Sequence, residues 1–312
     1  MKIRLGYVSI SKKLNITPSH TITYKNYLKL DDESRYKKLD EIINKNLDSF
    51  YKILKYNLKN EIFFYRATST LIPLATHKCV NYNWKDKYDY KFKLIGEFIN
   101  RNNMRVDFHA EEYCVLNSIH NDVVDSSINI LKFYKTMLQK LEICGKIILH
   151  VGSMYPNKKE ALNRFINNFN LLDDDLKKLI ILENDDKCFN VEDVLFLCNK
   201  LKVPMVLDYH HHLCLHNDSD IKKYIIKIFD TWNDDLLIPK VHFSSPKNSI
   251  EYRAHNEFVF SKDFIKFIDE IKFIDRDFDI MLEAKGKDEA LFKLVKDLKK
   301  QYKFIKKSIF LT

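Results

Sequence analysis

The sequence predicts one α/β domain over residues 1–312, folded as a single closed (β/α)8 TIM barrel. Eight stretches with a strand pattern alternate with stretches of helical period, which is typical of parallel sheets built from βαβ crossovers. The expected strand Val203–Tyr209 begins with an apolar run without alternation that lasts until Asp208, which favours a strand buried on both faces. The 312 residues are somewhat more than the ~250 of a typical barrel. An open doubly wound sheet is the alternative.

Each expected strand is a short apolar run, and each expected helix carries an apolar stripe of helical spacing. The strands are predicted at Lys2–Ser9, Glu61–Ala67, Met104–His109, Lys146–Gly152, Leu179–Asn184, Val203–Tyr209, Pro239–Phe243 and Asp279–Glu283. The helices are predicted from Asp31 or Asp32 to about Leu58, then at Tyr90–Asn100, Asp122–Ile143, Lys158–Phe169, Asp173–Leu179, Val191–Leu201, Ser219–Trp232, Lys262–Ile274 and Lys287–Phe304. Gly145 is expected as a helix C-cap, and Ile10–Lys29 as a long functional loop.

Composition narrows the possible partners. The formal net charge is +9, which favours a polyanion such as nucleic acid, although a lysine-rich enzyme is the plainer interpretation. No strand is followed by GxGxxG or GxxxxGK[ST], so no nucleotide cofactor is expected. The six cysteines include no CxxC pair and are expected to be reduced thiols. With no secretory leader and no membrane-spanning run, we expect a cytoplasmic monomer without a membrane partner.

Metal-capable side chains end six consecutive predicted strands. In parallel barrels the carboxyl ends of the strands carry the chemistry, so side chains at these ends should meet. One histidine at a strand end is more often a surface residue, and a buried acid is often paired with Lys or Arg. Five histidines and three carboxylates at one end are harder to explain in that way. These residues are His109, His150, Glu183, Asp208, His211, His242, His255 and Glu283.

Eight such ligands exceed the needs of one four-coordinate ion and predict a cluster of two or three divalent ions. Mixed imidazole and carboxylate ligation suits Mn or Zn, and Fe or Mg is possible. Such a cluster activates water and holds a phosphoryl group for in-line displacement. His210 and His212, which alternate with His211 on the expected strand, should point away from the ions. The residues therefore predict a basic barrel that cuts a phosphodiester.

Several motifs resemble the UV damage endonuclease family. They run in family order from residue 6 to about residue 295 and comprise GYVS, YRATSTLIPLATH, FHAEEY, LHVGS, LENDDK, DYHH, PKVHFSSPK and LEAKGKD. The resemblance implies a TIM barrel related to endonuclease IV. It also implies a metal-dependent nick on the 5′ side of pyrimidine dimers, 6-4 photoproducts and abasic sites in double-stranded DNA. Up to three ions, usually Mn, are implied.

The resemblance carries the eight ligands over and adds four further residues. Lys240 matches a lysine that the family can carry as a carboxylated metal ligand, while a phosphate or carboxylate partner is the equal alternative. Glu112 and Tyr113 match a Gln-Tyr pair that is inserted opposite the lesion, and Tyr7 matches an aromatic residue lining the lesion site. We expect Glu183 to bridge two ions, with His109, His242 and Lys240 as further catalytic residues.

Three alternatives stay open at this stage. An endonuclease IV-type enzyme would cut only at abasic sites. A metal-dependent sugar isomerase could use the same barrel, although it would not need a basic rim. A catalytically inactive metalloprotein could bind damaged DNA without cutting it, although all eight ligands are present in the sequence.

Overall fold

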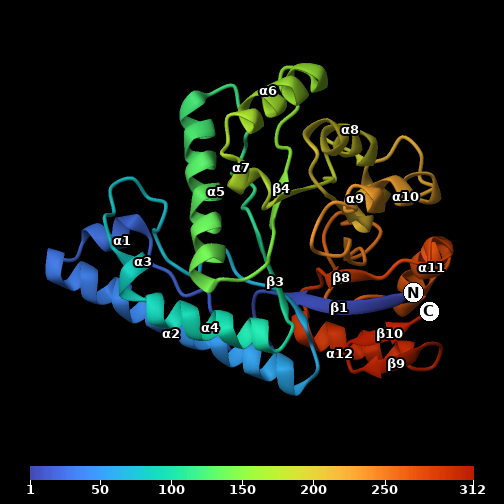
Figure 1. Ribbon diagram of the computed structural model, residues 1–312, viewed down its shortest axis with the longest axis horizontal. Coiled ribbons are helices and arrows are strands. Elements are labelled where there is room, and N and C mark those ends of the chain that lie inside the picture. Colours follow the sequence, from blue (N-terminus) through green and yellow to red (C-terminus); the bar gives the residue numbers. More distant parts are fainter.

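A computed structural model of the protein describes all residues, 1–312, and shows eight parallel strands closed into a barrel with helices outside it (Figure 1). The hydrogen-bonded order runs from β2 through β8 to β1, and the pairing of β1 with β2 closes the ring. This confirms the predicted fold class. The strands are β1 Lys2–Val8, β2 Phe64–Arg66, β3 Arg105–His109, β4 Ile147–His150, β5 Ile180–Glu183, β6 Met205–Asp208, β7 Lys240–Phe243 and β8 Phe278–Leu282.

Helices cover the outside of the barrel between the strands. Asp31 caps α2, as expected, by accepting a hydrogen bond from the backbone N–H of Ser34, and Asn190 opens α8 with a full capping box. The helices are α1 Tyr24–Leu28, α2 Asp32–Lys59, α3 Trp84–Lys87, α4 Asp89–Arg101, α5 Asn121–Leu141, α6 Lys158–Asn170, α7 Asp174–Lys177, α8 Val191–Leu201, α9 Tyr209–Cys214, α10 Lys222–Asp230, α11 Ser261–Ile271 with a 3₁₀ turn at Lys272–Ile274, and α12 Lys287–Leu298.

Three local expectations were wrong, and two of them concern a cap and a loop. Helix α5 ends at Leu141 and is capped by Glu142, which adopts the left-handed conformation. A Cβ on Gly145 would lie 2.3 Å from the carbonyl oxygen of Val106. Gly145 is therefore needed for close packing against β3 and not as a cap. The expected loop at residues 10–29 contains the short helix α1.

The C-terminus also differs from the prediction. Helix α12 ends at Leu298, and the chain continues as an antiparallel hairpin of β9 Lys303–Lys306 and β10 Ile309–Leu311. Strand β10 pairs with the first residues of β1, which brings the two termini together (Figure 1). The alternating pattern of the last residues, with Phe310 fully buried, is a strand signal that the preceding helical stripe obscured.

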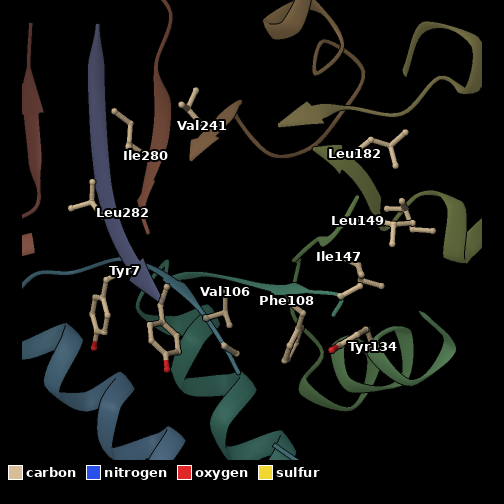
Figure 2. Packing of buried hydrophobic residues seen from close by; sticks show 14 of the residues in the cluster. Tyr7, Val106, Phe108, Tyr134, Ile147, Leu149, Leu182, Val241, Ile280 and Leu282 are labelled. Atoms are coloured by element: carbon tan, nitrogen blue, oxygen red, sulfur yellow. The ribbon is translucent and has the colours of Figure 1, made fainter. Parts of the chain in front are cut away.

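A cluster of 73 buried residues fills the space between the strands and the helices. Figure 2 shows part of it, including strand residues such as Val106 and Leu182. Because the core lies mostly outside the strand ring, the inward-facing side chains of the barrel are free to be polar. No helix is both long enough and apolar enough to span a membrane.

Candidate metal centre

The carboxyl ends of β3 to β8 bring the predicted ligands together. His109, His150, Glu183 and Asp208 are the last residues of β3, β4, β5 and β6. In the register of the sheet, His150 lies beside Glu183 and Asp208 lies beside His242. We call the following eight residues the metal rim: His109, His150, Glu183, Asp208, His211, His242, His255 and Glu283.

Glu183 lies between two groups of candidate ligands. One of its carboxylate oxygens, Oε2, is 3.0 Å from Nε2 of His109 and 3.8 Å from Nε2 of His150. These three residues place their ligand atoms within 4.8 Å of one another. This spacing is compact enough for one shared cation.

The other oxygen of Glu183 faces the second group. Glu183 Oε1 is 2.8 Å from Nδ1 of His242, and that nitrogen is 3.0 Å from Oε1 of Glu283. Asp208 completes this group, again with ligand atoms within 4.8 Å. The single side chain of Glu183 is therefore placed to contact two ions.

His211 and His255 lie next to this second group. Nδ1 of His211 is 3.7 Å from Oδ2 of Asp208 and 3.9 Å from Oε1 of Glu183. The ring centroids of His211 and His255 are 6.2 Å apart. The structure thus brings both histidines to the rim, although neither belongs to the two compact groups.

The three consecutive histidines are not on a strand, which corrects the expectation for His210 and His212. Strand β6 ends at Asp208, whose carboxylate caps α9 by accepting from the backbone N–H of His211 at 2.8 Å. Successive side chains on a helix are rotated by about 100°, so His210 and His212 point in other directions than His211 because of the helix and not because of strand alternation. His212 points away from the rim and is 3.2 Å from the carbonyl oxygen of Ser219, whereas the ring centroid of His210 lies 5.5 Å from that of His255 and 5.7 Å from that of Tyr252.

Backbone carbonyls hold three of the rim histidines in one tautomer. Nδ1 of His109 lies 2.7 Å from the carbonyl oxygen of Ala110, and Nδ1 of His255 lies 2.7 Å from that of Glu283. His211 makes the same contact with the carbonyl of Asn184 at 3.0 Å. Each Nδ1 must therefore donate a hydrogen, which leaves Nε2 as the free ligand atom.

The electrostatics of the rim fit bound cations. Burial lowers the pKa of His109 to about 4, so at neutral pH its Nε2 is an acceptor that faces another acceptor, Glu183 Oε2. Burial also raises the pKa of Asp208, with Glu183 and Glu283 adding to the effect. Oδ2 of Asp208 and Nε2 of His242 are buried without any hydrogen-bond partner. Divalent ions would satisfy the acceptors of His109 and Glu183 that face each other and the unpaired oxygen of Asp208.

Charged neighbours shift two further pKa values. Burial alone would raise the pKa of Glu183, but His242 and His150 hold it well below its ordinary range. Although burial opposes it, the carboxylate of Asp208 raises the pKa of His211 to about 9. Ligation by His211 therefore requires the ion to displace a proton.

Lys240 lies below the rim and not in it. Its ammonium donates to Asp107 at 2.8 Å, and both side chains are fully enclosed. This contact matches the carboxylate pairing that the sequence left open for Lys240, and its role as a carboxylated metal ligand stays a prediction. Lys240 belongs to a buried ionic cluster, which we call the floor network and which comprises Arg4, Arg105, Asp107, Lys240 and Asp279.

The sequence analysis missed the floor network and Arg66. Asp107 and Lys240 each precede a rim histidine by two residues, so the period of a strand places them on the same inner face. That spacing was a usable signal. Arg66, the last residue of β2, donates through Nη1 to Oε1 of Glu283 and lines the pocket over the rim.

The rim opens into a pocket of about 570 Å³. Glu112 lines it, while Tyr113 is 67% exposed on the loop after β3, as a residue that contacts DNA would be. Tyr7 is placed differently. It is 0% exposed, and its hydroxyl donates to Oδ1 of Asn57 in α2 at 2.7 Å, so it faces the core and not the pocket (Figure 2).

Comparisons with known proteins agree on one family. The family model described as UV-endonuclease UvdE matches residues 3–310. A UV DNA damage endonuclease of Bacillus cereus (strain 03BB102) is 36% identical over 302 residues, which cover 96% of this chain and 95% of that protein. The crystal structure of SacUVDE superimposes with a TM-score of 0.87 at 36% identity, covering 96% of this chain and 98% of that one. Endonuclease IV from Thermus thermophilus, at 12% identity and a TM-score of 0.56 over 95% and 99% of the chains, shares the fold.

Proposed function

The chain belongs to the UV-endonuclease UvdE family and is thus a DNA repair endonuclease, and we propose that it uses a cluster of two to three divalent ions to nick damaged double-stranded DNA on the 5′ side of UV lesions. The proposal includes pyrimidine dimers, 6-4 photoproducts and abasic sites as substrates, Mn as the preferred ion, and a monomeric enzyme. The main support for this proposal is the position of Glu183 between two groups of candidate ligands.

Glu183 supports a multi-ion centre because each of its oxygens faces a different set of ligands. His109 and His150 lie on the Oε2 side, and His242 lies on the Oε1 side. A carboxylate in this position bridges two cations more naturally than it pairs with four imidazoles. We therefore assign the first ion to His109, His150 and Glu183, and a second to Glu183, Asp208, His242 and Glu283. His211 and His255, with Asp208, are the proposed ligands of a third.

The bound ions would supply an activated water and charge stabilisation at the phosphoryl group. The chain itself must position the DNA and keep the ligands in place. Arg66 restrains Glu283, and the carbonyl of Ala110 fixes the ring of His109. Exposed Tyr113 can stack in the gap that a displaced lesion leaves, which is worth about 1–3 kcal/mol per base.

The proposed reaction is hydrolysis of one phosphodiester. Water forms a new bond to phosphorus while the bond from phosphorus to the 3′ oxygen breaks, leaving a 3′-hydroxyl and a 5′-phosphate. The damaged pair leaves the helix before the cut, at a cost that is lowered because damage already weakens its pairing. Glu112, a carboxylate at the pocket, disfavours close phosphates and is the residue we expect to tune the choice of lesion.

Supercoiled plasmid tests the proposal directly. Irradiated, abasic and intact plasmids are incubated with the protein and Mn, and nicked circles are counted. We expect nicking of the irradiated and abasic plasmids and little of the intact one. Nicking of the abasic plasmid alone would leave an endonuclease IV-type activity, and binding without nicking would indicate an inactive damage-binding protein.

A further inference from the structure

Lys287, the first residue of α12, is held rigidly beside the metal rim. On one side, the backbone N–H of Gly286 donates to the carbonyl of Glu257 at 2.7 Å. On the other, the carboxylate of Asp288 accepts from the hydroxyl of Ser11 at 2.6 Å and from the backbone N–H of Lys12 at 2.8 Å. Both anchors fix the backbone at residue 287, which adopts a left-handed φ of +53°. A lysine there is strained, and such strain collects at functional positions.

The ammonium of Lys287 makes no hydrogen bond and no ion pair, although the side chain is only partly exposed. Burial lowers its pKa, and the nearby charge of Arg66 lowers it further. Glu283 and Glu257 are also close, but each already has a basic partner, Arg66 and Lys12 respectively. Lys287 is thus a confined cation without a counter-ion in a protein whose substrate is a polyanion.

Arg66, whose charge acts on Lys287, supplies a second set of donors. It uses Nη1 for Glu283, while its other guanidinium nitrogens have no hydrogen-bond partner in the protein. Arg66 lines the 570 Å³ pocket together with His109 and Glu283. Two neighbouring cations with free donors, one planar and one compact, match the oxygens of a phosphate group.

We propose that Lys287 and Arg66 together bind one phosphate of the nicked DNA strand, next to the phosphodiester that reaches the metal rim. This inference rests on the proposed function and adds to it a specific contact between the protein and one DNA phosphate. The contact is a positioning one, because neither residue belongs to the ligand groups. The anchored backbone around Lys287 would hold the strand in register with the centre.

Lys287→Gly is the most informative variant. Glycine accepts the left-handed conformation without strain, so the variant should be at least as stable as the parent protein. DNA binding should nevertheless fall by about five- to tenfold near physiological salt, and the slope of log affinity against log salt should drop by part of the about 0.9 that one whole phosphate contributes, because Arg66 remains. Binding is measured on irradiated duplex in a Glu183→Gln background, which prevents cutting. Lys287→Arg should restore most of the loss.

Lys296→Gly is unsuitable as a control because it breaks α12, so Lys296→Met is the matched loss of one exposed charge on the same helix. It should change affinity and salt slope little. If Lys287→Gly and Lys296→Met reduced the affinity and the slope equally, Lys287 would be only part of the general positive field, and the proposal would be wrong.

A neutral linkage in the DNA gives the decisive readout. The affinity of the parent and of Lys287→Gly is measured for a set of duplexes, each with a single methylphosphonate at a different position near the lesion. We expect one position at which the substitution weakens the parent about fivefold and weakens the variant clearly less, because only Arg66 still contacts that phosphate in the variant. Equal losses in both proteins at every position would overturn the proposal. This result is separate from the proposed function, which fails only if the parent protein does not nick damaged plasmid.

Discussion

The interior of the barrel holds two sets of buried charges that differ in what neutralises them. In the floor network, Asp107 contacts Arg105 and Lys240, and Asp279 contacts Arg4 and Arg105. Two carboxylates thus face three basic side chains, and the only unpaired nitrogen is Nη2 of Arg105. The floor needs nothing from outside the protein.

The metal rim has the opposite balance. Its three carboxylates face histidines, and only Glu283 has a basic partner, Arg66. The rim keeps Asp208 Oδ2, His150 Nδ1 and His242 Nε2 buried without partners. A buried acid paired with Lys or Arg therefore has a structural role, whereas a buried acid that faces histidines is a candidate metal ligand. The partner of the acid, and not the acid itself, distinguishes the two cases.

The sharpest way to test this contrast is Glu183→Gln on the rim. We expect nicking to fall by about 10³-fold or more, equivalent to about 4 kcal/mol of lost transition-state stabilisation, because both ligand groups lose the carboxylate that they share. Salt-dependent DNA binding should largely remain. Single-turnover nicking and a binding titration check the two parts. Full activity in this variant would show that the ligand assignment is wrong.

The corresponding change in the floor is Asp279→Asn. The amide removes the negative charge with which Asp279 pairs to both Arg4 and Arg105. Breaking a buried ion pair typically costs about 3–5 kcal/mol. The free energy of unfolding, measured with denaturant, should fall by that amount, while folded protein should still nick damaged DNA. A loss of activity without a loss of stability would place the floor in the reaction.

Metal removal should affect only one of the two regions. With ions at about a hundredfold excess over their Kd, binding stabilises the folded state by about 2.7 kcal/mol, and chelation should remove that increment. Asp279→Asn should keep the increment, whereas Glu183→Gln should lose most of it. Denaturation midpoints with Mn and with a chelator give the comparison. An equal increment in both variants would mean that the ions bind elsewhere.

The sequence predicted the barrel and the meeting of the ligands because both depend on short-range patterns. Apolar runs define strands, and parallel strands end together, so His150 and Glu183 had to be neighbours. Arg105, Asp107 and Asp279 interrupt such runs, and their pairing is set by which strands lie opposite each other in the closed ring. That arrangement is a property of the tertiary structure.

Other errors have local causes. The histidines after Asp208 look like a continuing strand, but Asp208 caps a helical turn there. The inward or outward direction of Tyr7 depends on strand register, since one step along β1 reverses the face. Two-residue spacing before a rim ligand would have revealed Asp107 and would have placed it on the same inner face of the barrel as Lys240.

Glu112→Gln should give the smallest effect, and it tests the outer edge of the rim. The residue is exposed at the pocket and takes no part in either ligand group, so the catalytic centre should be intact. Removing its negative charge should change the ratio of nicking at dimers to nicking at abasic sites by about two- to fivefold, because the amide no longer repels phosphates and can donate hydrogen bonds.

Glu142→Gln, the same change at an exposed glutamate that ends α5, is the control and should leave the ratio unchanged. Nicking rates on duplexes with one defined lesion provide the measurement. If Glu112→Gln slowed every substrate equally, the residue would support the metal centre and would have no part in lesion choice. The rim would then extend further from the barrel axis than its ligand groups indicate.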